Sequence, residues 1–155
     1  MSLEQELQTE QVSHLDLSGF CKVVSGTAVN DTLAQMRSEK QNVCLITNKS
    51  RLIGILTDRD VLRKVAADAA TWDQPVDEIM TRNPVTVSPE TAAAKALWLM
   101  DEKHFRNLPV VNNDGTIIGT MTHQSIVSYL AARYPIEILN QPPIPNRFPN
   151  ESDGG

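Results

Sequence analysis

The sequence of 155 residues has few cysteines and no long hydrophobic run. Its two cysteines, Cys21 and Cys44, are too few for a disulfide framework and stand in apolar runs, so we expect buried free thiols in a reducing cytoplasm. No run approaches the roughly 18 apolar residues that a membrane-spanning helix needs. The N-terminal residues are acidic and contain no apolar core segment of a secretory signal. We therefore expect a cytoplasmic protein with no membrane partner.

The sequence also lacks a concentration of positive charge. Its 14 lysines and arginines are scattered among 19 aspartates and glutamates, which gives a net charge of −5. Because binding nucleic acid through its phosphates requires clustered basic residues, the composition argues against a nucleic-acid partner. The proportions of 41% hydrophobic and 21% charged residues are ordinary for a globular protein. A chain of this length forms one domain or a compact pair of units.

Residues that commonly carry catalysis or bind metals are sparse as well. The three histidines, His14, His104 and His123, stand at spacings that match no zinc-binding pattern, and neither cysteine has a motif neighbour. The sequence contains no glycine-rich phosphate loop of the Walker or Rossmann type. We therefore predict that the chain is not an enzyme, has no catalytic residues, and requires neither a metal nor a cofactor.

What the sequence does contain is an internal repeat. Three segments of the first half recur in the second half in the same order: 24–27 with 87–90, 43–46 with 108–111, and 52–57 with 117–122. The first pair is 63 residues apart and the other two are 65 apart, with Gly54 aligned on Gly119. The change in spacing predicts a two-residue insertion in the second copy, between its first helix and its second strand. The chain is therefore two copies of one structural unit.

Each copy predicts the order strand, helix, strand, turn, strand, helix. The elements of the first copy are a strand at 22–24, a helix capped by Asn30 or Asp31, a strand at 43–47, a turn at 48–50, a strand at 52–57, and a helix from Asp58. Those of the second copy are a strand at 85–87, a helix at 92–103, a strand at 108–111, a turn at 113–115, a strand at 116–121, and a helix at 124–133. The apolar run 43–46 does not alternate, which is typical of a strand covered on both faces, so we predict an α/β fold.

The third strand of the first copy leads into a motif suited to a nucleotide. Thr57 opens a helix, where free backbone N–H groups favour a phosphate. Asp60, one turn later on the same side, can accept hydrogen bonds from two ribose hydroxyls. Gly54 in the strand lets a ligand or another backbone segment approach closely. The same Thr-x-x-Asp spacing is also a capping box that merely satisfies the helix start, and the sequence alone leaves both interpretations open.

The two copies together resemble a tandem pair of CBS (cystathionine β-synthase) domains, also called a Bateman module. The resemblance covers residues 15–133 and rests on four segments: 54–60, 77–87, 107–111 and 119–122. It implies an α/β fold of two pseudo-twofold related β-α-β-β-α units packed through their sheets, and a homodimer of such modules. We accordingly divide the chain into an N-terminal extension (1–14), a first unit (15–68), a linker (69–80), a second unit (81–134) and a proline-rich tail (135–155).

The resemblance also implies two clefts between the units, which in relatives bind AMP, ADP, ATP or S-adenosylmethionine. In the first cleft, Thr57 and Arg106 would contact phosphate, Asp60 the ribose, and the segment around Thr86 the adenine; guanidinium suits phosphate because it offers forked donors. The residues carried over by position are Thr57, Asp58, Arg59, Asp60, Thr86, Val87, Arg106 and Asn107.

The second cleft departs from this pattern. Ser125 replaces the carboxylate of Asp60, and Gln41 and Asn42 stand where the first cleft has an arginine and an asparagine. A hydroxyl accepts a diol less well than a carboxylate does, so we expect weaker nucleotide binding there, or none. The residues assigned to this cleft are Val23, Gln41, Asn42, Thr122, His123 and Ser125.

The sequence thus predicts a stand-alone regulatory module that senses cellular energy. It binds an adenosine ligand between its units and changes its conformation or its binding to an unidentified protein target. The alternative is a ligand-free dimerisation module or scaffold with vestigial clefts. Intact Asp60 and Arg106 favour the first interpretation, whereas the altered second cleft favours the alternative.

Overall fold

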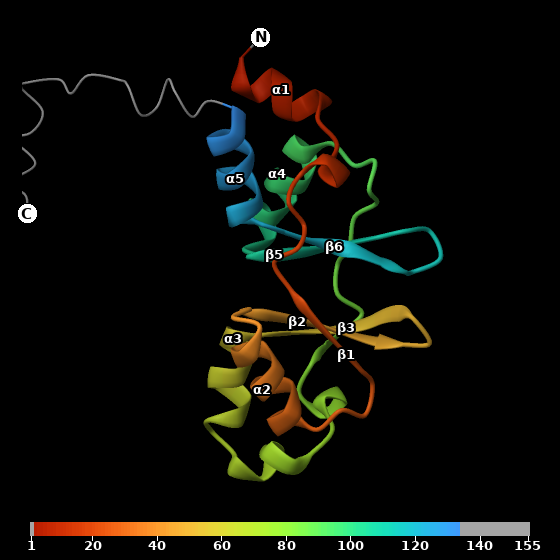
Figure 1. Cartoon of the computed structure of the whole chain (residues 1–155), viewed down its shortest axis with the longest axis vertical. Coiled ribbons are helices and arrows are strands. Elements are labelled where there is room, and N and C mark those ends of the chain that lie inside the picture. The colour runs from red at the N-terminus through yellow and green to blue at the C-terminus, as the bar shows by residue number, and fades with distance from the viewer. Residues whose placement is uncertain (1, 134–155) are drawn as a thin grey trace, which may run out of the picture.

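The computed structural model describes residues 2–133 of the chain. Two sheets face each other across the middle of the molecule, and the helices cover their outer faces: α1, α4 and α5 at one end, α2 and α3 at the other (Figure 1). This arrangement confirms the predicted α/β fold of two units packed through their sheets. The tail that we delimited at 135–155 lies outside the described residues.

The helices and strands follow the predicted order, except for the strand that was expected at 85–87. The first half contains α1 (Leu3–Thr9), β1 (Cys21–Val24), α2 (Val29–Ser38), β2 (Val43–Asn48), β3 (Arg51–Thr57) and α3 (Asp58–Asp60), which continues as a π-helical turn (Val61–Val65). The second half contains β4 (Thr81–Arg82), α4 (Ala93–Lys103), β5 (Asn107–Val111), β6 (Ile117–Thr122) and α5 (His123–Arg133). Short 3-10 turns span Val12–His14, Ala69–Asp73 and Val76–Glu78.

A small core lies between the two sheets. Buried Val43, Leu45 and Ile55 from the first sheet pack there, with partly buried Ile117 from the second. The Leu52 N–H donates to the Gly115 carbonyl (3.0 Å), which joins the two hairpins directly. Burial of β2 on both faces agrees with its unbroken apolar run, as predicted.

The predicted strand at 85–87 is wrong. The first sheet has the order β1-β2-β3-β4, whereas the second contains only β5 and β6. Val87 forms an isolated parallel bridge to Val110, in which its N–H donates to the Pro109 carbonyl (3.0 Å). Because Pro109 has no N–H to donate, the ladder cannot continue on its other side. Instead, β4 pairs with β3 and extends the sheet of the first unit.

The structure also corrects the alignment of the repeats. Lys40 and His104 both take the left-handed conformation after their helices (φ 56° and 57°), and β2 and β5 begin equivalently at Val43 and Asn107. Each of these pairs is 64 residues apart. The spacing of 65 therefore arises only within the hairpin of the second unit, whose turn is one residue longer than that of the first unit. The predicted two-residue insertion between the first helix and the second strand of the second copy is wrong. In a run of consecutive apolar residues neighbouring registers look alike, which misled the sequence alignment.

The segment that precedes each unit packs on the other unit. Leu15 and Leu17, which we assigned to the first unit, lie in the core of the second with Met100 and Leu108. Conversely, the 3-10 turn Val76–Glu78 and the residues after it cover the core of the first unit. The two halves therefore interlock, and the division of the chain into five segments stays a prediction.

We call these two segments, 15–17 and 74–80, the crossing segments. The second of them accounts for two local features of the first unit. Asn30 or Asp31 was predicted to cap α2, but the N-cap is Ala28, which makes no side-chain cap. The first helical N–H, of Val29, instead donates to the Gln74 carbonyl (2.8 Å) of the crossing segment. The close neighbour of Gly54 is the side chain of Met80, which is neither the ligand nor the backbone segment that the sequence led us to expect.

Two further findings concern the cysteines and the lack of long apolar helices. Cys21 and Cys44 are buried free thiols, as predicted, and are register partners on β1 and β2. Within residues 2–133, no helix is long and apolar enough to cross a membrane.

Candidate functional site

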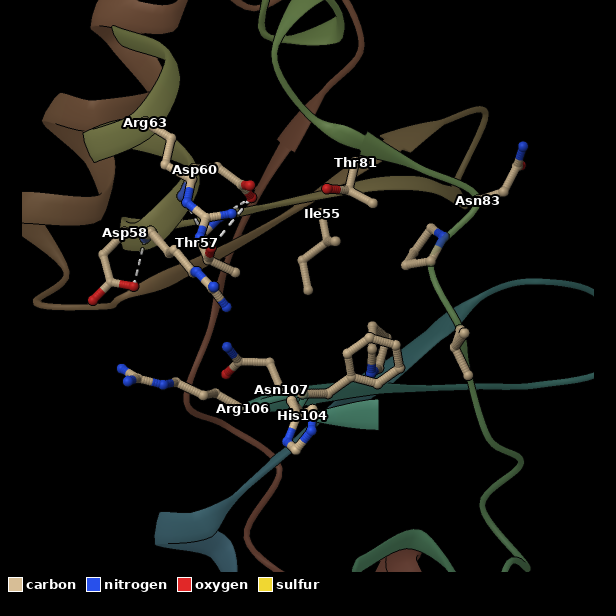
Figure 2. A pocket seen from close by; sticks show the side chains of 15 residues that line it. Ile55, Thr57, Asp58, Asp60, Arg63, Thr81, Asn83, His104, Arg106 and Asn107 are labelled. Carbon is tan, nitrogen blue, oxygen red and sulfur yellow. Dashed lines mark hydrogen bonds between the residues drawn. The ribbon is translucent and has the colours of Figure 1, made fainter. Parts of the chain in front are cut away.

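A cavity of about 340 Å³ lies between the two units, and both contribute to its wall. Figure 2 shows side chains of the first unit, among them Thr57 and Asp60, facing Arg106 and Asn107 of the second. The cavity is lined by Ile55, Thr57, Asp58, Arg59, Asp60, Arg63, Thr81, Asn83, Pro84, Val85, His104, Phe105, Arg106, Asn107 and Pro109.

Six of the eight residues predicted for the first cleft line this cavity. Thr86 and Val87 do not, and Asn83, Pro84 and Val85 line it instead. The Asn83 N–H donates to the Ile53 carbonyl (3.1 Å), and its left-handed backbone (φ 50°) turns the chain out of β4 and along the cavity. Val87 is used in the bridge to the second sheet. Sequence reasoning placed this wall too far along the chain because it assumed a strand at 85–87.

Thr57 and Asp60 form the capping box that the sequence left open. The Thr57 N–H and hydroxyl both donate to Asp60 Oδ2 (3.1 and 3.2 Å), and the Asp60 N–H donates to Thr57 Oγ1 (3.3 Å). Both residues also line the cavity, so the capping role and a ligand role are compatible. The cap uses Oδ2 of the carboxylate, and Oδ1 is not part of it. The α-helical part of the following helix is only three residues long, so the site rests on its side chains.

Arginines make the cavity wall locally basic. Arg59 and Arg106 were predicted from the sequence, whereas Arg63 was missed. A signal was present, since Arg63 stands three residues after Asp60 and therefore on the same side of the helix. Within residues 2–133, the side chains of these three arginines form no ion pair or hydrogen bond. They are available to an anionic ligand.

The remainder of the wall is mainly apolar. It includes Ile55, which is 8% exposed, and Phe105, Pro84, Val85 and Pro109. In Figure 2, Arg63, Asp58 and Arg106 lie at one side of the cavity, whereas Asn83 lies at the other. The cavity therefore combines guanidiniums with apolar surface, which suits a ligand that has both an anionic and an apolar group.

The second cleft differs from the first more than the sequence indicated. With the corrected register, Asn42 is the counterpart of Arg106, and buried Val43 is the counterpart of Asn107. The Asn42 carbonyl accepts the Asp58 N–H (3.0 Å), so its backbone supports the first cleft. Phe20, the counterpart of Pro84, packs on the core between the sheets. Phe20 is thus part of this core, whereas Pro84 lines the cavity of the first cleft.

Other residues assigned to the second cleft are engaged in contacts within the protein or lie elsewhere. The Ser125 hydroxyl donates to the Asp16 carbonyl (2.6 Å) and accepts the Thr122 N–H (3.0 Å), so it holds the crossing segment. Val23 is buried in the core of the first unit. His123 lies on the wall of a separate cavity of about 600 Å³ that Leu7, Trp98 and other residues also line. Within residues 2–133, no group of His, Cys, Asp and Glu side chains is placed to hold a metal ion.

Comparison with known proteins agrees with the duplicated architecture. The profile of the CBS domain family matches residues 21–67 and 76–132, one match in each unit. The chain belongs to the CBS domain family. It is a tandem CBS pair, a regulatory module, and this confirms the resemblance found in the sequence.

The chain is 40% identical over 112 residues to the CBS domain-containing protein CBSCBSPB3 of Arabidopsis thaliana. The aligned region covers 71% of this chain and 20% of the relative. The CBS pair thus spans about a fifth of that relative.

Solved structures share the fold of the CBS pair at low sequence identity. The CBS domain pair of protein MJ0100, solved with 5′-methylthioadenosine and S-adenosyl-L-methionine, has a TM-score of 0.71 and 19% identity, over 81% of this chain and 98% of that one. CBSX2, solved with AMP, has a TM-score of 0.68 and 23% identity, over 79% and 97%. These likenesses support the fold.

Proposed function

We propose that the cavity binds an adenosine ligand such as AMP, ADP, ATP or S-adenosylmethionine, and that binding alters the conformation of the module or its binding to a protein target. The observation that carries this proposal is the convergence of polar side chains from both units on one cavity: Thr57 and Asp60 from the first, Arg106 and Asn107 from the second. The adenosine ligands named in the solved structures of MJ0100 and CBSX2 support the ligand class.

Each part of the ligand has a matching part of the wall. Asp60 Oδ1 accepts hydrogen bonds from the ribose hydroxyls, while Oδ2 remains in the cap. Arg59 and Arg106 donate to the phosphate. The adenine packs on the apolar wall, where Ile55 and Phe105 offer carbon surface.

A ligand in this position acts on the module through its contacts with both units. Because it touches the first unit at Thr57 and the second at Arg106, its binding energy depends on how the two units are placed. The shift in conformation cannot exceed the difference in the ligand's affinity for the two arrangements. The second cleft, with Phe20 and the engaged Ser125 hydroxyl, binds more weakly or not at all.

The proposal extends to assembly and location. The module acts in the cytoplasm as a homodimer, and exposed Trp98 (60%) and Val127 (53%) on α4 and α5 give it apolar surface to cover. The competing function is a ligand-free scaffold. The observation that favours it is the capping box, which gives Thr57 and Asp60 a purely structural use.

Calorimetric titration of the chain with AMP, ADP, ATP and S-adenosylmethionine tests the proposal. We expect binding of at least one ligand with one site per chain, and its loss in Asp60→Ala. Asp31→Asn, which removes an exposed carboxylate outside the cavity, is the matched control and should bind as the parent does. Thermal unfolding of each variant separates loss of the site from loss of the cap. Failure of every ligand to bind, or binding that Asp60→Ala leaves unchanged, would favour the scaffold.

A further inference from the structure

Three positive charges from two units meet at the cavity without a partner among residues 2–133. Arg59 and Arg63 come from the helix after β3, and Arg106 comes from the loop before β5. Figure 2 shows Arg63 and Arg106 at the same side of the cavity, on opposite walls. Like charges brought together repel one another, and an anion between them relieves that repulsion.

Two acidic groups, Asp58 and Asp60, share the cavity wall with the arginines. Asp60 Oδ2 accepts the hydrogen bond of the Thr57 hydroxyl in the capping box, and Asp58 Oδ1 accepts the Arg59 backbone N–H (2.8 Å). The described part of the chain contains no ion pair between either carboxylate and the guanidiniums. Three guanidiniums outnumber the two carboxylates, so the wall is net positive, and more than one guanidinium is available to the anionic groups of a ligand.

The repeat shows that the arginines are not needed for folding. At the corrected register, the counterparts of Arg59, Arg63 and Arg106 are Gln124, Ser128 and Asn42. The counterpart segments form β2, β6 and α5 without these cations. All three arginine side chains are also exposed, so packing does not account for them. A ligand at the first cleft gives a common reason for their presence.

We propose that the cavity selects adenosine ligands with a di- or triphosphate chain over AMP and over S-adenosylmethionine, and that Arg63 binds the phosphate beyond the first. This inference rests on the proposed function and specifies its ligand. Arg59 and Arg106 hold the first phosphate, and each further phosphate adds negative charge within reach of Arg63. The sulfonium of S-adenosylmethionine instead brings a positive charge toward the guanidiniums, which repel it.

Calorimetric titration of the full chain with AMP, ADP, S-adenosylmethionine and inorganic pyrophosphate tests the selection. We expect ADP to bind about tenfold more tightly than AMP, the effect of one charge-assisted contact, and S-adenosylmethionine to bind more weakly than AMP. Arg63→Ala should abolish the difference between ADP and AMP while leaving AMP affinity within about twofold. Arg37→Ala, which removes an exposed arginine of α2 outside the cavity, should leave every affinity unchanged.

The outcomes separate this inference from the function on which it rests. Equal affinity for AMP and ADP, or an equal loss of both in Arg63→Ala, overturns the selection and leaves adenosine binding in place. Binding of pyrophosphate that Arg63→Ala weakens, with no binding of either nucleotide, supports Arg63 as a phosphate ligand and overturns the adenosine proposal. No binding of any probe overturns both.

Discussion

The carboxylate of Asp77 accepts a hydrogen bond from the hydroxyl of Ser25, at the end of β1. Its other oxygen accepts the Gly26 N–H (2.7 Å), so one side chain of the crossing segment holds the turn after β1. The Arg82 guanidinium donates to the Asp77 carbonyl (3.1 Å) and ties the same segment to β4. The junction between the units is therefore fastened to the first unit by polar contacts as well as by packing.

These contacts predict an acid-sensitive contribution to stability. The hydrogen bond from Ser25 lowers the pKa of Asp77 below its ordinary value of 3.8. A lowered pKa in the folded state stabilises the fold above that ordinary value, and the contribution disappears as pH falls through the folded pKa. We expect Asp77→Ala to lower the free energy of unfolding at pH 7 by about 1 kcal/mol, and by less near pH 3. Urea unfolding at both pH values measures this; a constant difference, or an equal loss in exposed Glu102→Ala, would contradict it.

The two strand glycines should differ in their tolerance of a methyl group. A Cβ at Gly119 would lie 2.5 Å from both Cβ and the carbonyl oxygen of Leu17, whereas one at Gly54 would lie 2.3 Å from Sδ of Met80. The methionine side chain can rotate away, but the backbone of Leu17 cannot. We expect Gly119→Ala to cost about 3 kcal/mol and Gly54→Ala about 1 kcal/mol.

Denaturant unfolding of the two glycine variants checks this order. Met80→Ala in the Gly54→Ala background should recover part of the loss, because it removes the atoms that the new methyl group meets. A larger cost at position 54 than at 119 would refute the prediction.

Ser125 should prove structural. Its hydroxyl links Asp16 and Thr122, and the residue is buried (2% exposed). Ser125→Ala leaves the Asp16 carbonyl without this donor, so we expect a loss of about 1–3 kcal/mol in the free energy of unfolding. Affinity for the ligand of the first cleft should stay at the parent value in calorimetry. Unchanged stability of Ser125→Ala would contradict this structural role.

The cysteine pair should resist chemical modification. The hydrogen bond with Cys21, and burial, raise the pKa of the Cys44 thiol, which keeps it protonated. The same contact lowers the pKa of Cys21, so this thiol is protected by its burial (2% exposed). We expect iodoacetamide at pH 8 to label neither cysteine in the folded protein and both after unfolding in urea. Mass spectrometry of the intact protein counts the labels. Rapid labelling of the native protein at Cys44 would be inconsistent with this burial.

Much of the fold could be predicted because its signals are local. The unbroken apolar run of β2 indicated burial on both faces, and both hairpin turns were placed correctly by residues such as Gly115, whose φ is +87°. The Thr57–Asp60 pair was also recognised, since three residues of separation place two side chains together at a helix start. These features depend on neighbours along the chain.

Other features were missed because they depend on distant partners. The alignment of the two repeats could be fixed only by strand pairing, which makes Asn42 the counterpart of Arg106 in the other unit. The wall at Asn83 follows from the pairing of β4 with the sheet of the other unit, which no local pattern announces. The N-cap of α2 was misplaced for the same reason, since its acceptor comes from Gln74.

The sequence by itself determined that the chain is a duplicated α/β unit, because a repeat can be recognised along the chain. The two clefts, one with arginines and one without, were implied by the resemblance to CBS domain pairs. Only the tertiary structure decided which unit each connecting segment covers and which side chains share the cavity. The reason is that hydrogen bonds between strands and the burial of apolar surface act across space, and segments such as 16–18 and 79–83 find their partners far along the chain.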